Sequence, residues 1–242
     1  MNDVREFLWR LNSERHFYLK NIRKLFDFIN RDIKITNYYD CKEILFDNIY
    51  FKYKEFLPKG DGIVFDIGSQ YGDYAIACNK LYGSKLVIAF EPLQRNYKIA
   101  KRNIKLSKAG DSVFLSDYAI SDCEILGMSN NSMLTNLDLF GKWFKPDFIV
   151  LDNLVKGLER NYIIKIDIIK IDVEGFEMHV LESAINTIKK YKPKIIIETH
   201  NYRLFDLVFN FLGELGYNLI YSDYNGYSNI FDYVVNNFYL PS

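Results

Sequence analysis

The chain has 242 residues, 49% of them hydrophobic, enough to bury the core of one domain with an accessory segment. Its 31 lysines and arginines balance its 31 aspartates and glutamates, so no overall field draws it to nucleic acid or an anionic membrane. The three cysteines lack CxxC spacing and the three histidines lack HxxxH spacing, which disfavours a disulfide framework and a zinc site. The start is charged and no apolar run approaches the ~20 residues of a membrane span, so we expect a cytoplasmic protein without a transmembrane segment.

Residues 1–57 are predicted to form a mostly helical accessory or cap segment, because apolar residues recur at helical spacing up to about residue 30. A Pro/Gly cluster from Pro58 to Gly62 then marks a boundary, and residues 58–242 are predicted to form the main domain. The apolar face of the N-terminal helix must pack on something. This face either packs on the same chain, where the segment would cover a substrate site, or packs on a second copy of the chain in a homodimer.

Beyond the boundary, apolar strands alternate with amphipathic helices. Strands are predicted at Ile63–Phe65, Leu86–Phe90, Ser112–Leu115, Ile168–Ile171 and Ile195–Ile197, and helices from about Gly72, over Arg95–Ser107, from Phe176 to about Lys192 and over Leu204–Leu215. Two final strands flank Asp223–Gly226, where Asn-Gly predicts a hairpin turn. The pattern predicts an α/β, Rossmann-like fold with a mostly parallel sheet and a C-terminal antiparallel hairpin.

An acidic residue follows each of four predicted strands: Asp66, Glu91, Asp172 and Glu198. In open α/β sheets, ligands bind beyond the carboxyl ends of the strands. Any one of these acids is explained equally well as a helix cap. Four at corresponding positions favour a ligand site.

Two glycines and two polar residues form the turn after the first strand. Gly68 lets the chain turn tightly and lets a ligand approach the backbone, and Gly72 relieves crowding where the helix begins. The dinucleotide fingerprint is GxGxxG, whereas this loop reads GxxxG with the bulk of Ser69 and Gln70 inside it. A cofactor bound through a pyrophosphate is therefore disfavoured, and so is a nicotinamide-dependent oxidoreductase.

A ligand with an amino-acid tail suits this loop better. Asp66 would face its ammonium group, directly or through water. Glu91 closes the next strand, at the place where an acid accepts hydrogen bonds from ribose hydroxyls. The glycine loop alone is a weak signal for such a cofactor, and Glu91 after the next strand strengthens it.

Five stretches of the chain resemble, in order and spacing, the FkbM-type methyltransferases, a branch of the class I S-adenosylmethionine-dependent enzymes. They are Val64–Gly72, Ala89–Pro92, Ala119–Ser121, Ile169–Glu177 and Ile197–His200, and the string Ile-Lys-Ile-Asp-Val-Glu-Gly within the fourth is the most specific. The resemblance covers roughly residues 58–222. This sequence has Ser69-Gln70 where the family often has Ala-Asn, and its N-terminal part matches poorly, which leaves the methyl acceptor open.

The resemblance implies S-adenosylmethionine as cofactor and S-adenosylhomocysteine as product. It places Asp66, Gly68 and Gly72 around the methionine end, Glu91 on the ribose and Asp117, Tyr118 and Ala119 along the adenine, with Ser69, Gln70, Pro92 and Asp172 as further cofactor-binding residues. Family members mostly O-methylate sugars and secondary metabolites. The expected activity is therefore O-methylation of a hydroxyl on a sugar, glycan or small metabolite.

Three residues are candidates for the base and for groups that orient the acceptor: Asp172, Glu174 and His200. In-line methyl transfer to a hydroxyl needs the reacting atoms aligned and a proton removed. Asp172, Glu198 and His200 are alternatively ligands for magnesium or manganese. No dedicated ligand spacing supports that alternative, so we predict no metal.

Two other function classes remain as alternatives. Basic residues on helix 95–108 (Arg95, Lys98, Lys101, Arg102, Lys105 and Lys108) form a stripe that would suit RNA phosphates in an RNA methyltransferase. Such a stripe is more often the solvated face of a helix, so we expect a small-molecule or glycan acceptor and no nucleic acid. A non-catalytic nucleotide-binding protein would keep the fold without turnover.

Overall fold

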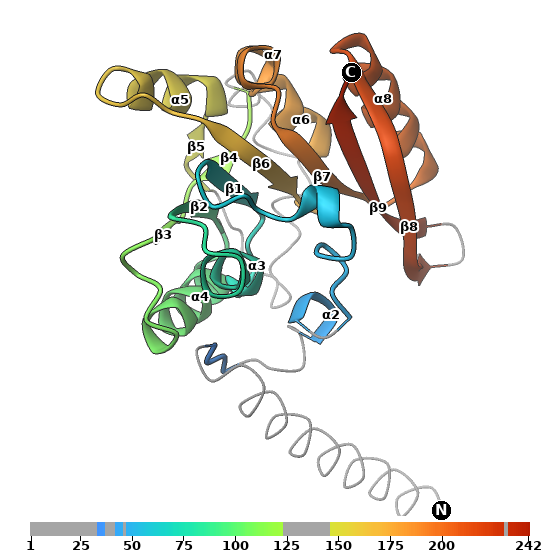
Figure 1. The fold of residues 1–242 in the computed structure, drawn as a ribbon. Helices are drawn as coiled ribbons and strands as arrows, with labels where there is room; N and C mark the ends of the chain where they lie inside the picture. Colours follow the sequence, from blue (N-terminus) through green and yellow to red (C-terminus); the bar gives the residue numbers. More distant parts are fainter. Residues whose placement is uncertain (1–32, 37–41, 46, 123–145, 230–231) are drawn as a thin grey trace, which may run out of the picture.

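The computed structural model describes residues 33–36, 42–45, 47–122, 146–229 and 232–242 (Figure 1). The predicted N-terminal helix lies outside these residues. Among the described residues, no helix combines the length and hydropathy needed to cross a bilayer.

A seven-stranded sheet with the order β3-β2-β1-β6-β7-β9-β8 forms the centre of the fold. Its strands are β1 (Ile63–Ile67), β2 (Leu86–Phe90), β3 (Val113–Ser116), β6 (Ile166–Ile171), β7 (Lys194–Thr199), β8 (Tyr217–Asn229) and β9 (Asp232–Pro241). The first five of these pair in parallel, and β9 runs antiparallel to β7 and β8. Two short strands, β4 (Ala119–Ile120) and β5 (Phe148–Ile149), pair separately. The Rossmann-like prediction is confirmed.

Helices cover both faces of the sheet (Figure 1). They are α2 (Lys42–Leu45), α3 (Asp73–Lys80), α4 (Gln94–Leu106), α5 (Leu151–Glu159), α6 (Glu177–Glu182), α7 (Ile185–Tyr191) and α8 (Tyr202–Glu214), with a 3-10 helix η1 (Lys54–Phe56). One apolar core joins the sheet to α2, α3 and α4, and a second joins it to α5, α6, α7 and α8. Since both faces are covered, every residue of the central strands β1 and β6 is buried.

The segment before β1 packs on the sheet through aromatic contacts. Within residues 33–57, the described helices are α2 and η1. The ring of Tyr53 stacks on that of Tyr221 with centroids 3.6 Å apart, and its hydroxyl donates to Asp223 over 2.7 Å. Phe56 is fully buried against Phe238. The segment is therefore joined to the C-terminal strands.

Two local predictions were wrong. The helix predicted from Phe176 to Lys192 is broken into α6 and α7, because Asp152 of α5 accepts hydrogen bonds from the backbone N–H groups of Asn186 and Thr187 at 2.9 and 2.7 Å. An outside carboxylate thus caps a new helix start. The hairpin turn predicted at Asp223–Gly226 lies inside β8, which continues to Asn229 with an irregular register at this point.

Candidate functional site

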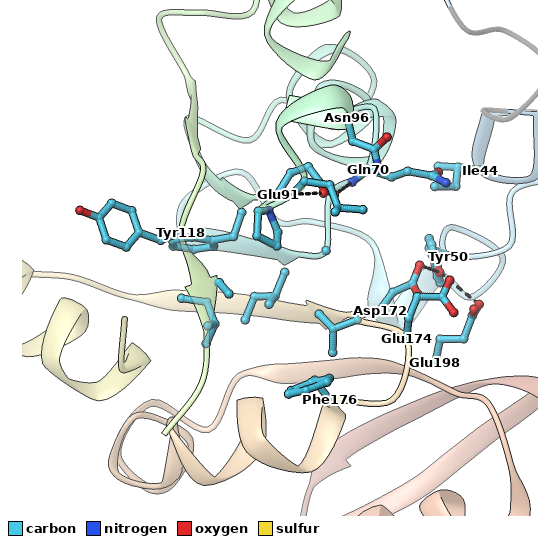
Figure 2. Close-up of a pocket in the computed structure, with 18 of the residues that line it drawn as sticks. Ile44, Tyr50, Gln70, Glu91, Asn96, Tyr118, Asp172, Glu174, Phe176 and Glu198 are labelled. Atoms are coloured by element: carbon cyan, nitrogen blue, oxygen red, sulfur yellow. Dashed lines mark hydrogen bonds between the residues drawn. The ribbon is translucent and has the colours of Figure 1, made fainter. Parts of the chain in front are cut away.

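The carboxyl ends of β1, β2, β6 and β7 border a cavity of about 480 Å³ (Figure 2). Its loop side comprises Gln70, Glu91, Pro92, Leu93, Asn96 and Tyr118, and its carboxylate side comprises Tyr50, Asp172, Glu174 and Glu198. Apolar wall is added by Ile44, Ile49, Ile67, Phe90, Ile120, Val173 and Phe176. Figure 2 shows the two sides facing each other across the cavity.

The glycine loop closes tightly over the end of β6. Gly68 has φ +78°, and a Cβ atom at this position would meet the carbonyl oxygen of Asp172. The backbone N–H groups of Gly68 and Ser69 both donate to the Phe90 carbonyl, at 3.0 and 2.9 Å. Gln70 also adopts a left-handed conformation, with φ +47°. The loop therefore has no room for a side chain at Gly68.

Glu91 presents a buried carboxylate to the loop side. It is 5% exposed, and its two oxygens accept hydrogen bonds from the backbone N–H groups of Gln70 and Leu93, at 2.8 and 2.9 Å. Burial, only partly offset by these bonds, raises the pKa of Glu91 from 4.5 to about 7. A buried carboxylate of this kind gains from further hydroxyl donors in the cavity.

We expect this carboxyl to make the protein less stable as the pH rises from about 4.5 to 7. Across that range folded Glu91 keeps a proton that the unfolded chain releases, so the free energy of unfolding falls, by at most about 3 kcal/mol. Urea unfolding of wild type and Glu91→Gln at pH 5 and pH 8 measures this. The variant should gain stability relative to wild type at pH 8, and a constant difference between the two pH values would contradict the assignment.

A buried ammonium group connects the glycine loop to the carboxylate side. Lys170 Nζ donates to the Gly68 carbonyl at 2.8 Å and lies 3.3 Å from Asp66 and 3.5 Å from Asp172. Burial alone would lower its pKa, but Asp66 and Asp172 outweigh burial and raise it. Asp66 itself is fully buried, and burial raises its pKa despite Lys170. Asp66 lies on β1 and is not among the residues that line the cavity.

His200 is enclosed by carboxylates. Its Nδ1 lies 3.2 Å from Glu177, and its Nε2 lies 3.3 Å from Glu174 and 3.2 Å from Glu198. Burial opposes a charge on the imidazole, but hydrogen bonds with Glu177 and Glu198 and the charge of Glu174 prevail and raise the pKa of His200 to about 11. At neutral pH the ring is thus a fixed cation that donates from both nitrogens.

Comparison with known proteins shows which family the chain belongs to. The Methyltransferase FkbM domain matches residues 66–219, from the glycine loop to the start of β8. The chain belongs to the FkbM methyltransferase family. The resemblance described from the sequence is thereby confirmed. No protein with a curated description matches the chain.

The solved structures similar to this chain include an FkbM methyltransferase. Methyltransferase FkbM from Methylobacillus flagellatus KT is 16% identical, with a TM-score of 0.52 over 83% of this chain and 51% of that one. This chain thus spans about half the length of that structure. Precorrin-6y C5,15-methyltransferase from Geobacter metallireducens GS-15 is 13% identical, with a TM-score of 0.49 over 78% and 84% of the two chains. A putative tRNA (m1A22) methyltransferase from Streptococcus pneumoniae, solved with S-adenosyl-L-methionine, is 14% identical, with a TM-score of 0.46 over 76% and 68%.

Most of the site residues predicted from the FkbM resemblance meet at this cavity. Its lining includes Gly68, Gln70, Glu91, Pro92, Tyr118, Ala119, Asp172 and Glu174. Ser69 is buried within the loop, and Gly72 caps the start of α3 in a left-handed conformation. Asp117 is exposed and accepts a hydrogen bond from Gln94. His200 reaches the cavity through Glu174 and Glu198.

Several lining residues were missed from the sequence. Glu43, Ile44, Ile49 and Tyr50 come from the segment before the FkbM match and carry no motif that would mark them. Phe176, predicted only as the start of a helix, also lines the cavity.

Proposed function

We propose that this FkbM-family protein is an S-adenosylmethionine-dependent O-methyltransferase acting on a hydroxyl of an uncharged sugar, glycan or small metabolite. The observation that carries the proposal is the cavity itself. In it, the glycine loop and Glu91 face a group of carboxylates placed to handle a hydroxyl proton.

The loop side fits S-adenosylmethionine, which supplies an electrophilic methyl group on its sulfonium when bound. Glu91 would accept hydrogen bonds from the two ribose hydroxyls, in addition to the two it already accepts from the backbone. Tyr118, 43% exposed at the cavity, would lie along the adenine. Asp66, held by Lys170, would act on the methionine end only through the loop it supports.

The carboxylate side fits proton removal. Asp172 directly follows β6 and lines the cavity, so we assign it as the base that takes the proton of the acceptor hydroxyl. Glu174, in a left-handed turn with φ +53°, would orient other hydroxyls of the acceptor. His200 is already protonated, so its role would be that of a fixed positive partner and not that of a base.

A divalent cation on these residues is the weaker alternative. Ligand atoms of Asp172, Glu174 and His200 do lie within 4.8 Å of one another. However, both ring nitrogens of His200 already lie within 3.3 Å of carboxylate oxygens, and no dedicated ligand spacing marks these residues in the sequence. We therefore assign proton removal on the carboxylate side to residues of the chain.

An RNA acceptor is supported only by α4, whose basic residues Arg95, Lys98, Lys101, Arg102 and Lys105 are exposed, as is Lys108 beyond its end. The cavity argues against it, because Asp172, Glu174 and Glu198 would repel backbone phosphates at the place of transfer. We propose that residues 1–57 form a cap whose last part walls the acceptor position, next to the main domain of residues 58–242.

Calorimetric titration with S-adenosylmethionine and S-adenosylhomocysteine, with NAD as a control ligand, tests the proposal. We expect micromolar binding of the first two by wild type and by Glu214→Ala, an exposed change on α8, and at least tenfold weaker binding by Glu91→Ala. Absence of binding to both ligands, or binding of NAD alone, would refute the proposed function. Undiminished binding by Glu91→Ala would refute the role of Glu91.

A further inference from the structure

Tyr50 joins the segment before the FkbM match to the reacting end of the cavity. Its hydroxyl lies 3.1 Å from Asp172 Oδ2 and 3.3 Å from Glu198 Oε2, and its single proton is donated to this pair of carboxylates (Figure 2). The ring is 1% exposed and packs edge-on against Tyr74, with centroids 5.6 Å apart. The phenol is therefore held in one position by the core.

The carboxylates that Tyr50 bridges end neighbouring parallel strands. Asp172 follows β6 and Glu198 lies near the end of β7, so both carry negative charge into the same space. One cation lies on each outer side of the pair: Lys170 Nζ is 3.5 Å from Asp172, and His200 Nε2 is 3.2 Å from Glu198. Tyr50 supplies the donor between them, where two like charges would otherwise face each other.

These contacts orient Asp172. Both Tyr50 and Lys170 approach its Oδ2 atom, and Oδ1 accepts no hydrogen bond from the described residues. The side chain is 24% exposed at the cavity, so Oδ1 is the atom left to accept a proton. The other charged groups packed around this point are Asp66 on β1, Glu174 and Glu177 around the start of α6, and Glu198 and His200 after β7.

We propose that Tyr50 is a positioning residue that fixes Asp172 as the proton acceptor in methyl transfer, so that the N-terminal segment completes the active site. The proposal rests on the proposed function, which assigns the base. The hydroxyl proton passes to Asp172 Oδ1, the acceptor oxygen bonds to the methyl carbon, and the carbon–sulfur bond breaks with its electron pair left on sulfur. Tyr50 keeps its own proton throughout, because burial and both carboxylates hold its pKa well above 10.

Tyr50→Phe tests this role, and Tyr74→Phe is the matched control. Both remove one buried phenol oxygen, and the rings are in contact, but only Tyr50 reaches the carboxylates. In ¹³C-labelled protein, NMR titration follows the carboxyl carbons of Asp172 and Glu198, assigned through Asp172→Asn and Glu198→Gln. We expect at least one of the two midpoints to rise by about one pH unit in Tyr50→Phe and neither to move in Tyr74→Phe.

Affinity for S-adenosylmethionine, measured by calorimetry, should stay within about threefold of wild type in both variants, since Tyr50 lies on the carboxylate side. Equal midpoints in Tyr50→Phe and wild type would overturn the positioning role. So would equal shifts in both variants, because these would show a general effect of the lost phenol. If wild type fails to bind the cofactor, the proposed function falls, whereas the titration still decides whether Tyr50 sets the state of the carboxylates.

Discussion

Gly68→Ala is expected to abolish cofactor binding and to lower the free energy of unfolding by about 2–5 kcal/mol. The backbone at Gly68 is left-handed, with φ +78°, which an alanine adopts only at a cost. The added methyl group would also meet the carbonyl oxygen of Asp172 and lie 3.1 Å from Val173 Cγ1. Because the obstacle is backbone at the end of β6, relief requires the loop and the strand to separate, which would disrupt the loop side.

The control is Gly83→Ala. Gly83 has a similar φ of +71°, but a Cβ atom there would meet nothing within 4 Å. Gly83→Ala should therefore lower the free energy of unfolding only by the cost of a left-handed alanine, about 1–2 kcal/mol. Urea unfolding of both variants at pH 7 makes the comparison. Equal losses would show that close approach to Asp172 contributes nothing.

Lys170→Met is expected to lower the free energy of unfolding by about 3–5 kcal/mol. The ammonium group is 2% exposed, and it is the cation that lies against the fully buried Asp66. Methionine preserves the length of the side chain but leaves that carboxylate without its partner and the Gly68 carbonyl without its donor. The pKa of Asp66 is already raised, so the variant should regain part of the loss at low pH, where Asp66 takes up a proton.

Lys165→Met, the matched control, removes an exposed partner of Asp61, and should leave the free energy of unfolding nearly unchanged. Chemical unfolding at pH 5 and pH 8 covers both variants. A Lys170→Met protein as stable as Lys165→Met would mean that Asp66 is protonated in the wild type, and that the ion pair does not exist.

The β-α framework was predictable from the sequence because its signals are local. Runs such as Ile195–Ile197 are too short and too apolar for a surface helix, and four of the five predicted strands are followed by an acid at the same edge of the sheet. This is why Glu91 and Asp172 could be predicted from the sequence. The break between α6 and α7 was missed, because it depends on Asp152, whose contact with Thr187 spans 35 residues.

Tyr50 could not be recognised from its own surroundings. It is one of 19 tyrosines, and its contact with Asp172 spans 122 residues of sequence. The role of His200 was equally hidden, because its charge depends on Glu174, Glu177 and Glu198, which the fold gathers around it. The predicted hairpin turn failed for another reason: Asn225-Gly226 tolerates an irregularity inside a long strand as readily as it forms a turn.

The position of Lys170 bears on how such a protein can diversify. One ammonium group bonds the glycine loop and also touches Asp172, so a change there alters both sides of the cavity together. The wall formed by Glu43, Ile44 and Ile49 belongs to a different stretch of chain, outside the FkbM match. Changes in that wall can therefore alter the cavity while the glycine loop, Glu91 and Lys170 stay as they are. An engineer would confine a library to the same three positions.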